Sequence, residues 1–130
     1  MLNGVCICMD AEELKGRTQK LALEVIRLVQ NLPSQNSTRI VSWQLIRCGT
    51  SVGSNYRSAC RAKSRADFIA KLKIVEEECD ETIYWLELLR AMQISNEDSI
   101  ETLIGEASQI LRIIVASIRT ARLHPQGQNR

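Results

Sequence analysis

Basic side chains gather in one short stretch of this 130-residue chain. Between residues 57 and 73 six basic residues are opposed only by Asp67: Arg57, Arg61, Lys63, Arg65, Lys71 and Lys73. Such cations bind phosphate, and each contact releases counterions, so that affinity falls as salt rises. The cluster therefore predicts a phosphate-binding surface, and the candidate nucleic-acid contacts are Arg57, Arg61, Lys63 and Arg65.

The same cluster has two other interpretations. It can be a solvated corner without a partner, or it can pair with acids of another subunit. Residues 76–81 follow with five acids and no base, so head-to-tail pairing between subunits is open. Aromatic residues are sparse here, and Tyr56 directly precedes Arg57. Because single strands are held largely by stacking on aromatic rings, sequence-specific reading of a single strand is not expected.

The sequence contains few of the residues that a catalytic or metal site would need. The chain has one histidine, His124, close to its end. A serine or cysteine nucleophile needs a neighbouring base, and di-iron bundles use Glu-x-x-His pairs, which are missing here. The acidic run 76–81 is typical of a solvated helix face. We therefore expect no cofactor, no metal and no enzymatic activity.

The cysteines suggest packing rather than chemistry. Cys48, Cys60 and Cys79 lie in helical patterns and are predicted to be small core residues. Cys6 and Cys8 form a C-x-C pair with no further ligands nearby, so a metal role is not favoured. Reduced thiols would fit a cytoplasmic protein.

Composition supports an all-α domain without a membrane segment. Seventeen basic and fifteen acidic residues give a net charge of +2, which by itself does not imply nucleic acid. Aromatic residues make up 4% of the chain, so the core must be aliphatic, which favours helix-on-helix packing. No apolar run approaches the roughly 18 residues of a membrane span. Residues 1–9 lack the features of a secretory signal, so a cytoplasmic location is expected.

Four segments show apolar residues at alternating spacings of four and three, which predicts helices at about 11–32, 37–62, 64–93 and 95–122. The buried seam expected for the second is Val41, Leu45, Cys48, Val52, Asn55 and Ala59. For the fourth it is Ile100, Ile104, Ala107, Leu111, Ile114, Ile118 and Ala121. Leu103, Ile110 and Ile113 widen that last face, so that it could touch more than one neighbour.

Short connections between these segments force neighbouring helices to be antiparallel. We therefore predict an all-α, antiparallel up-down-up-down four-helix bundle over residues 11–122, with a flexible leader at 1–10 and a flexible tail at 123–130. Ser64 with Asp67, and Ser95 with Asp98, are expected to cap the third and fourth helices.

Gly49 and Gly53 interrupt the second predicted helix on one face, each at a cost of about 1 kcal/mol relative to alanine. The favoured interpretation is a close approach of another helix, or a bend. The alternative is that their bare backbone contacts a ligand.

Two long motifs resemble those of a known family. One is the string from Arg47 to Ala62, RCGTSVGSNYRSACRA, and the other runs from Phe68 to Thr82, FIAKLKIVEEECDET, followed by Tyr84-Trp85-Leu86-Glu87. Over residues 12–122 the chain is similar to the bacterial four-helix-bundle proteins encoded in intervening sequences of 23S ribosomal RNA genes. The resemblance implies a ring-shaped homopentamer. It also suggests distant kinship with accessory proteins of diversity-generating retroelements, which bind nucleic acid and a reverse transcriptase, and it supplies no catalytic residue.

The sequence thus predicts a non-enzymatic, oligomeric bundle that binds RNA or DNA non-specifically through its basic corner. The alternative is a scaffold protein whose charged surfaces serve self-assembly or a protein partner. Exposed Trp43, Trp85 or Ile113 would anchor the subunit interface.

Overall fold

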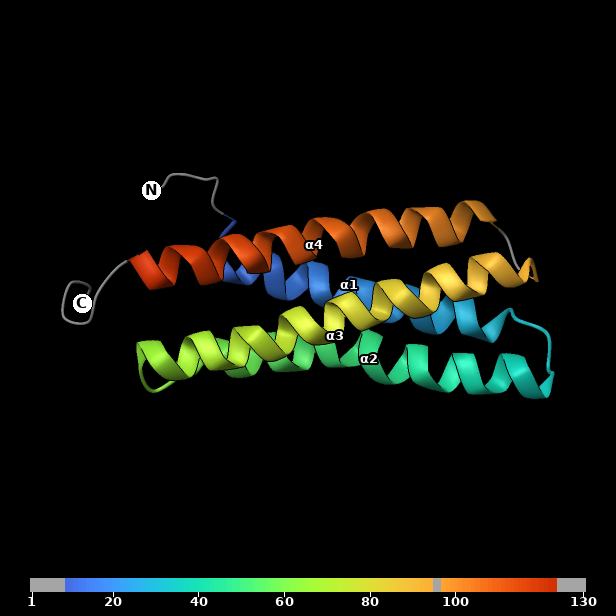
Figure 1. The fold of residues 1–130 in the computed structure, drawn as a ribbon, viewed down its shortest axis with the longest axis horizontal. Helices are drawn as coiled ribbons and strands as arrows, with labels where there is room; N and C mark the ends of the chain where they lie inside the picture. The colour runs from blue at the N-terminus through green and yellow to red at the C-terminus, as the bar shows by residue number, and fades with distance from the viewer. Residues whose placement is uncertain (1–8, 95–96, 124–130) are drawn as a thin grey trace.

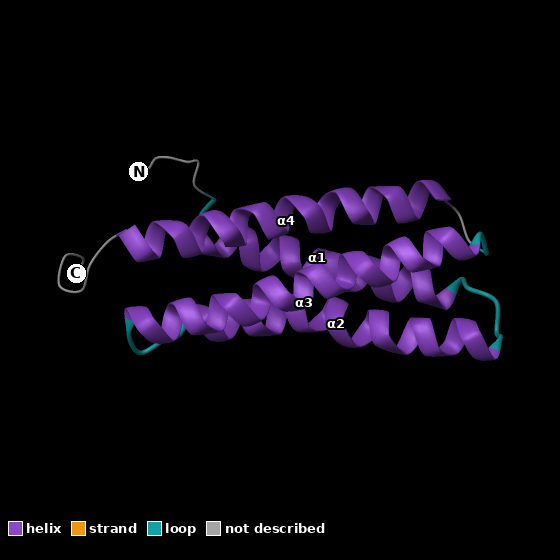
Figure 2. Ribbon diagram, viewed as in Figure 1, coloured by secondary structure: helices purple, strands orange, loops and turns teal. Residues whose placement is uncertain are grey.

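The chain forms a bundle of long antiparallel helices, shown in Figures 1 and 2. The structure is a computed structural model that describes residues 9–94 and 97–123. Within them lie α1 (Ala11–Gln30), α2 (Asn36–Cys60), α3 (Arg65–Met92) and α4 (Glu97–Leu123). The predicted all-α four-helix bundle is confirmed. Residues 1–8 of the expected leader 1–10, with Cys6 and Cys8, and residues 124–130 of the expected tail 123–130, with His124, lie outside the described residues, as does Ser95. Leu123, expected in the tail, is the last residue of α4.

The first and third helices begin at side-chain caps. Asp10 accepts a hydrogen bond from the Glu13 amide at 2.8 Å, which satisfies one of the unpaired donors at the start of α1. Ser64 accepts from the Asp67 amide at 3.0 Å, so the capping pair predicted there is confirmed. The Asp67 carboxylate in turn accepts from the backbone amide of Lys63 at 3.0 Å. The two hydrogen bonds made by Ser64 and by the Asp67 carboxylate fix the turn that joins α2 to α3.

Helices α1 and α2 approach closely where the two glycines lie. A Cβ atom on Gly49 would sit 3.2 Å from both Cγ atoms of Val25, and one on Gly53 would sit 3.1 Å from the Thr18 hydroxyl. Both distances are shorter than ordinary van der Waals contact, so a side chain at either position would require α1 to shift by a few tenths of an ångström. The close approach expected from the sequence is therefore present, and it needs no ligand to explain it.

The core is almost wholly aliphatic and is contributed by all four helices. In α4 the fully buried line includes Leu103 and Ile110, whereas Ile104 and Leu111 are half-buried at its edge. Four residues of the predicted seam are buried as expected, namely Ile100, Ala107, Ile114 and Ile118. At two further positions Leu103 and Ile110 lie deeper than the predicted Ile104 and Leu111. The reason is that α4 packs against both α3 and α1, so its deepest line falls between the two neighbours. The broad apolar face of α4 is used inside the bundle.

Asn55 and Cys60 of α2 also lie differently from the prediction. Tyr56 is buried, and the expected seam residue Asn55 is half-buried with its amide donating to the Ser51 carbonyl at 2.8 Å. Burial of the larger apolar ring is favoured over that of an amide. Cys60, predicted to be a core residue, is exposed because Ala59 takes the buried position in the last turn.

No helix formed by the described residues is long and apolar enough to cross a lipid bilayer.

Candidate nucleic-acid interface

The four predicted phosphate contacts lie together at one end of the bundle, around the turn between α2 and α3 (Figure 1). We call Arg57, Arg61, Lys63 and Arg65 the basic corner. Arg57, Arg61 and Lys63 are exposed, and Arg65 is half-buried. Within the described part of the chain, neither Arg57 nor Arg61 forms an ion pair. Their guanidinium groups therefore face solvent with their charge uncompensated by a bonded carboxylate.

Arg65 differs from the other three because it has a structural contact. Its Nη1 donates to the backbone carbonyl of Ala121 at 2.9 Å. That carbonyl belongs to the last turn of α4, where helix carbonyls lack partners within the helix. The bond fixes the end of α4 beside the start of α3, so the end of α4 adjoins the basic corner.

The single acid within the cluster is compensated locally. Both carboxylate oxygens of Asp67 accept from the Lys71 ammonium, at 2.7 and 2.9 Å. This hydrogen bond to Lys71, with that from the Lys63 amide, lowers the pKa of Asp67. Lys73 lies 3.9 Å from Glu76. Of the six basic residues in the predicted cluster, Lys71 and Lys73 thus pair with acids of their own helix.

The basic corner has no exposed aromatic ring from α2. Tyr56 retains only 8% of its surface exposed, and burial is the main reason that its pKa is raised. Its phenol ring therefore offers no face to a nucleobase. Whatever the corner binds must be held by charge and hydrogen bonds.

Two further cations at this end were missed by the sequence reasoning. Arg119 and Arg122 are exposed on the last turns of α4. Nothing in their local pattern separates them from solvated surface residues. Only the contact between Arg65 and α4 shows that they share an end of the bundle with the basic corner.

The acidic stretch of α3 is partly engaged by α2. Arg47 contacts the Glu78 carboxylate at 3.4 Å and also forms an ion pair with Glu81. The indole nitrogen of Trp85 donates to Glu81 at 3.2 Å. The hydrogen bond from Arg47, and that from Trp85, lower the pKa of Glu81. Acids 78 and 81 therefore fasten α3 to α2.

Large apolar side chains are exposed one to two helical turns beyond this ion pair. We call Ile40, Trp43 and Tyr84 the aromatic patch; their exposed fractions are 64%, 68% and 55%. Because α2 and α3 are antiparallel, Trp43 and Tyr84 lie in the same direction along the bundle from the Arg47–Glu81 pair. Of the interface anchors predicted from the sequence, Trp43 is exposed. Trp85 and Ile113 are half-buried against the core.

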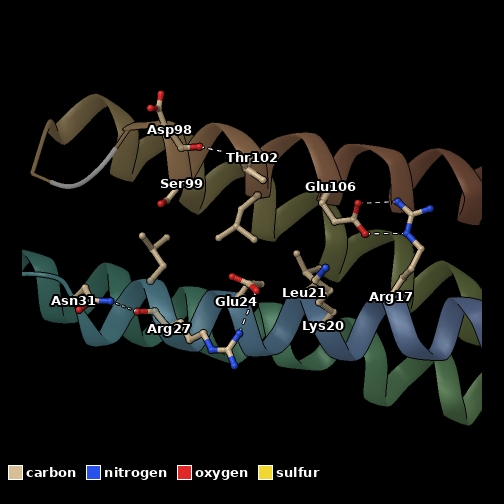
Figure 3. Close-up of a pocket in the computed structure, with 12 residues that line it drawn as sticks. Arg17, Lys20, Leu21, Glu24, Arg27, Asn31, Asp98, Ser99, Thr102 and Glu106 are labelled. Carbon is tan, nitrogen blue, oxygen red and sulfur yellow. Dashed lines mark hydrogen bonds and ion pairs between the residues drawn. The ribbon is translucent and has the colours of Figure 1, made fainter.

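A groove of about 870 Å³ runs between α1 and α4 (Figure 3). Buried Leu21 and Leu103 contribute to its lining. Arg17 on α1 reaches across to Glu106 on α4 with two hydrogen bonds of 2.9 and 2.8 Å, and these raise the pKa of the guanidinium. Two parallel bonds of this kind are among the stronger ion-pair geometries. The pair ties the first helix to the last across the groove.

Metal-ligating side chains do not converge in the part of the chain that the structure describes: no three of its His, Cys, Asp or Glu residues are placed to hold an ion together. Burial raises the pKa of the Cys48 thiol, and it raises that of Cys79 to about 12. Both thiols thus stay protonated at neutral pH, as expected of core residues.

Comparisons with known proteins agree with this architecture. The sequence pattern of the family described as 23S rRNA-intervening sequence protein matches residues 13–116. A crystal structure from Bacteroides thetaiotaomicron, of a protein with unknown function from the S23 ribosomal protein family, is 34% identical with a TM-score of 0.77. The match covers 85% of this chain and 99% of that one. A comparison with curated proteins finds no match.

Proposed function

This chain belongs to the 23S rRNA-intervening sequence protein family, and we propose that it is a non-enzymatic, oligomeric, cytoplasmic bundle protein that binds RNA or DNA without sequence preference. The basic corner would supply the phosphate contacts. The observation that carries this proposal is the pair of exposed arginines, Arg57 and Arg61, one helical turn apart and without an acidic partner among the described residues.

Local helix electrostatics explain only part of this charge. A cation in the last turn of a helix offsets the negative end of the helix dipole, by about 0.3–1 kcal/mol. Arg57 lies in the last turn of α2 and serves that purpose. Arg61 is the C-cap residue and lies at the same helix end. Lys63 is additional, although an excess of exposed like charges is unfavourable in the absence of a ligand. A polyanion would relieve that repulsion.

Assembly would make a weak surface useful. A corner with few phosphate contacts binds poorly at physiological salt, but several subunits on one polyanion raise the effective concentration and hence the avidity. Five subunits, as the family resemblance implies, would present five such corners.

Charge reversal tests the site. We expect Arg57→Glu with Arg61→Glu to weaken binding of short mixed-sequence RNA and DNA by roughly tenfold or more at low salt, measured by fluorescence anisotropy. The matched control is Arg39→Glu with Arg112→Glu, which changes the net charge equally at exposed positions away from the corner. Retained binding in the corner variant, or an equal loss in the control, contradicts the site.

A second candidate function is a scaffold whose charged surfaces, together with the aromatic patch, serve self-assembly or a protein partner. Exposed Trp43 favours it, because large aromatic residues dominate the energetics of protein interfaces. We expect Trp43→Ala to weaken self-association by roughly tenfold or more in sedimentation equilibrium. In the scaffold alternative the Arg57/Arg61 variant also dissociates the oligomer and no nucleic acid binds. In the favoured function this variant stays assembled.

A further inference from the structure

The end of the bundle that carries the basic corner is built from four helix ends. Helices α2 and α4 both finish there, and α1 and α3 both start there (Figure 1). Helix α3 contacts both α2 and α4, whereas α2 and α4 are diagonal and do not contact each other within the described residues. The start of α3 therefore separates two helix C-termini.

Both diagonal helices are free of acidic residues towards this end. Helix α2 contains no aspartate or glutamate at all, and α4 contains none after Glu106. Exposed arginines lie at both ends: Arg57 and Arg61 in α2 and the turn after it, Arg119 and Arg122 in α4. Residues three or four apart share a helix face, so each helix end presents one pair of guanidinium groups.

The remaining corner, at the start of α1, has the opposite character. Asp10, Glu12 and Glu13 lie there, and Glu12 pairs with Lys15 at 3.1 Å. A polyanion would avoid this side. The charge distribution thus confines it to the face made by the ends of α2, α3 and α4.

The two arginine pairs lie on diagonal helices, one on each side of the start of α3. Packed neighbouring helices lie 8–10 Å apart, so the diagonal axes of a bundle are separated by roughly 11–14 Å. The two pairs are thus held apart by a rigid scaffold and can contact two separate phosphate strands, as a double helix presents them. A flexible single strand presents no such fixed pair of phosphate lines.

The absence of a stacking surface points the same way. Single-stranded sites rely on aromatic rings against the bases, but Tyr56 is buried and the half-buried Phe68 packs against the core. Trp43 and Tyr84 lie further along the bundle, beyond the Arg47–Glu81 pair. Duplexes keep their bases stacked inside and are held through their phosphates.

We infer that the bundle end formed by α2, α3 and α4 binds double-stranded nucleic acid, with Arg119 and Arg122 as the second half of the site opposite Arg57 and Arg61. This inference rests on the proposed function and narrows its ligand to a duplex. The duplex lies across the start of α3 and is read through its shape and charge.

The test compares a short DNA duplex, an RNA duplex and each single strand in anisotropy titrations over a range of salt. We expect the wild-type protein to bind at least one duplex roughly tenfold more tightly than its strands. In Arg119→Glu with Arg122→Glu, duplex affinity should fall by roughly tenfold or more, and the slope of log affinity against log salt should fall by about two. The control Arg39→Glu with Arg112→Glu should bind duplex much as wild type does.

Circular dichroism checks folding, and Arg119→Gln with Arg122→Gln provides a milder variant. Single strands bound as tightly as both duplexes, or wild-type duplex affinity in the folded α4 variants, overturns the inference while leaving nucleic-acid binding intact. A wild-type protein that binds none of the four probes overturns the proposed function together with the inference.

Discussion

Gly49 and Gly105 are helix-interior glycines in opposite surroundings. A Cβ atom on Gly49 would lie 3.2 Å from both Cγ atoms of Val25, whereas one on Gly105 meets nothing within 4 Å. The same substitution to alanine therefore separates helix propensity from packing. At Gly105 only propensity changes, and at Gly49 the gain in propensity is opposed by a steric clash between α1 and α2.

The magnitudes follow from these surroundings. Alanine stabilises a helix interior by about 1 kcal/mol relative to glycine, so Gly105→Ala should raise the free energy of unfolding by about 1 kcal/mol and the Tm by about 3–5 °C. For Gly49→Ala the same gain is opposed by about 1–3 kcal/mol of overpacking, since Val25 is fully buried with both methyl groups facing the new carbon. We expect a net loss of about 0–2 kcal/mol.

Urea denaturation followed by circular dichroism at one protein concentration measures both changes, and gel filtration confirms equal assembly. In a Val25→Ala background, where the clash is removed, Gly49→Ala should become stabilising. If Gly49→Ala stabilises the wild-type protein as much as Gly105→Ala does, the two helices do not approach as closely as described, and the reasoning is refuted.

Three further outcomes are expected. The pKa of Glu81 is lowered in the folded state, so its stabilising contribution is present above the unfolded pKa of about 4.3 and is lost as pH falls through the folded pKa. The Tm should therefore fall less steeply between pH 7 and pH 3 in Glu81→Gln than in the wild-type protein, as measured by thermal unfolding. Arg65→Ala should lower the free energy of unfolding by about 1 kcal/mol and speed hydrogen exchange in the last turn of α4; unchanged exchange argues against the contact. Alkylation of the native protein, mapped by mass spectrometry, should modify Cys60 and spare Cys48 and Cys79, and labelling of all three would contradict their burial.

Periodicity predicted the helices well because each buries one continuous face. The predicted helix ends differ from the observed ones by at most two residues, and the Ser64 cap and the close approach at Gly49 were both readable from local pattern. Periodicity was less reliable in predicting which of two adjacent residues in a helix is more deeply buried. Tyr56 rather than Asn55 is buried, because side-chain size and the positions of both neighbouring helices decide that choice.

The candidate site was only half predictable. Arg57 and Arg61 lie close together in sequence, and a short turn keeps them close to Lys63 in space. Arg119 and Arg122 are some sixty residues away along the chain, and only the tertiary packing of α4 against the start of α3 brings them to the same end. No local signal marks such a pair. The hydrogen bond from Arg65 to the Ala121 carbonyl could not be predicted either, because it depends on where α4 ends in space.

We propose above that the protein is an oligomeric binder of phosphate polymers, and light scattering tests this most directly. The molar mass of the purified protein is measured alone and with a mixed pool of RNA and DNA, first at low and then at physiological salt. We predict a mass near five subunits that rises with nucleic acid at low salt and falls back as salt screens the contacts. A mass that is indifferent to nucleic acid at both salt concentrations would contradict the claim.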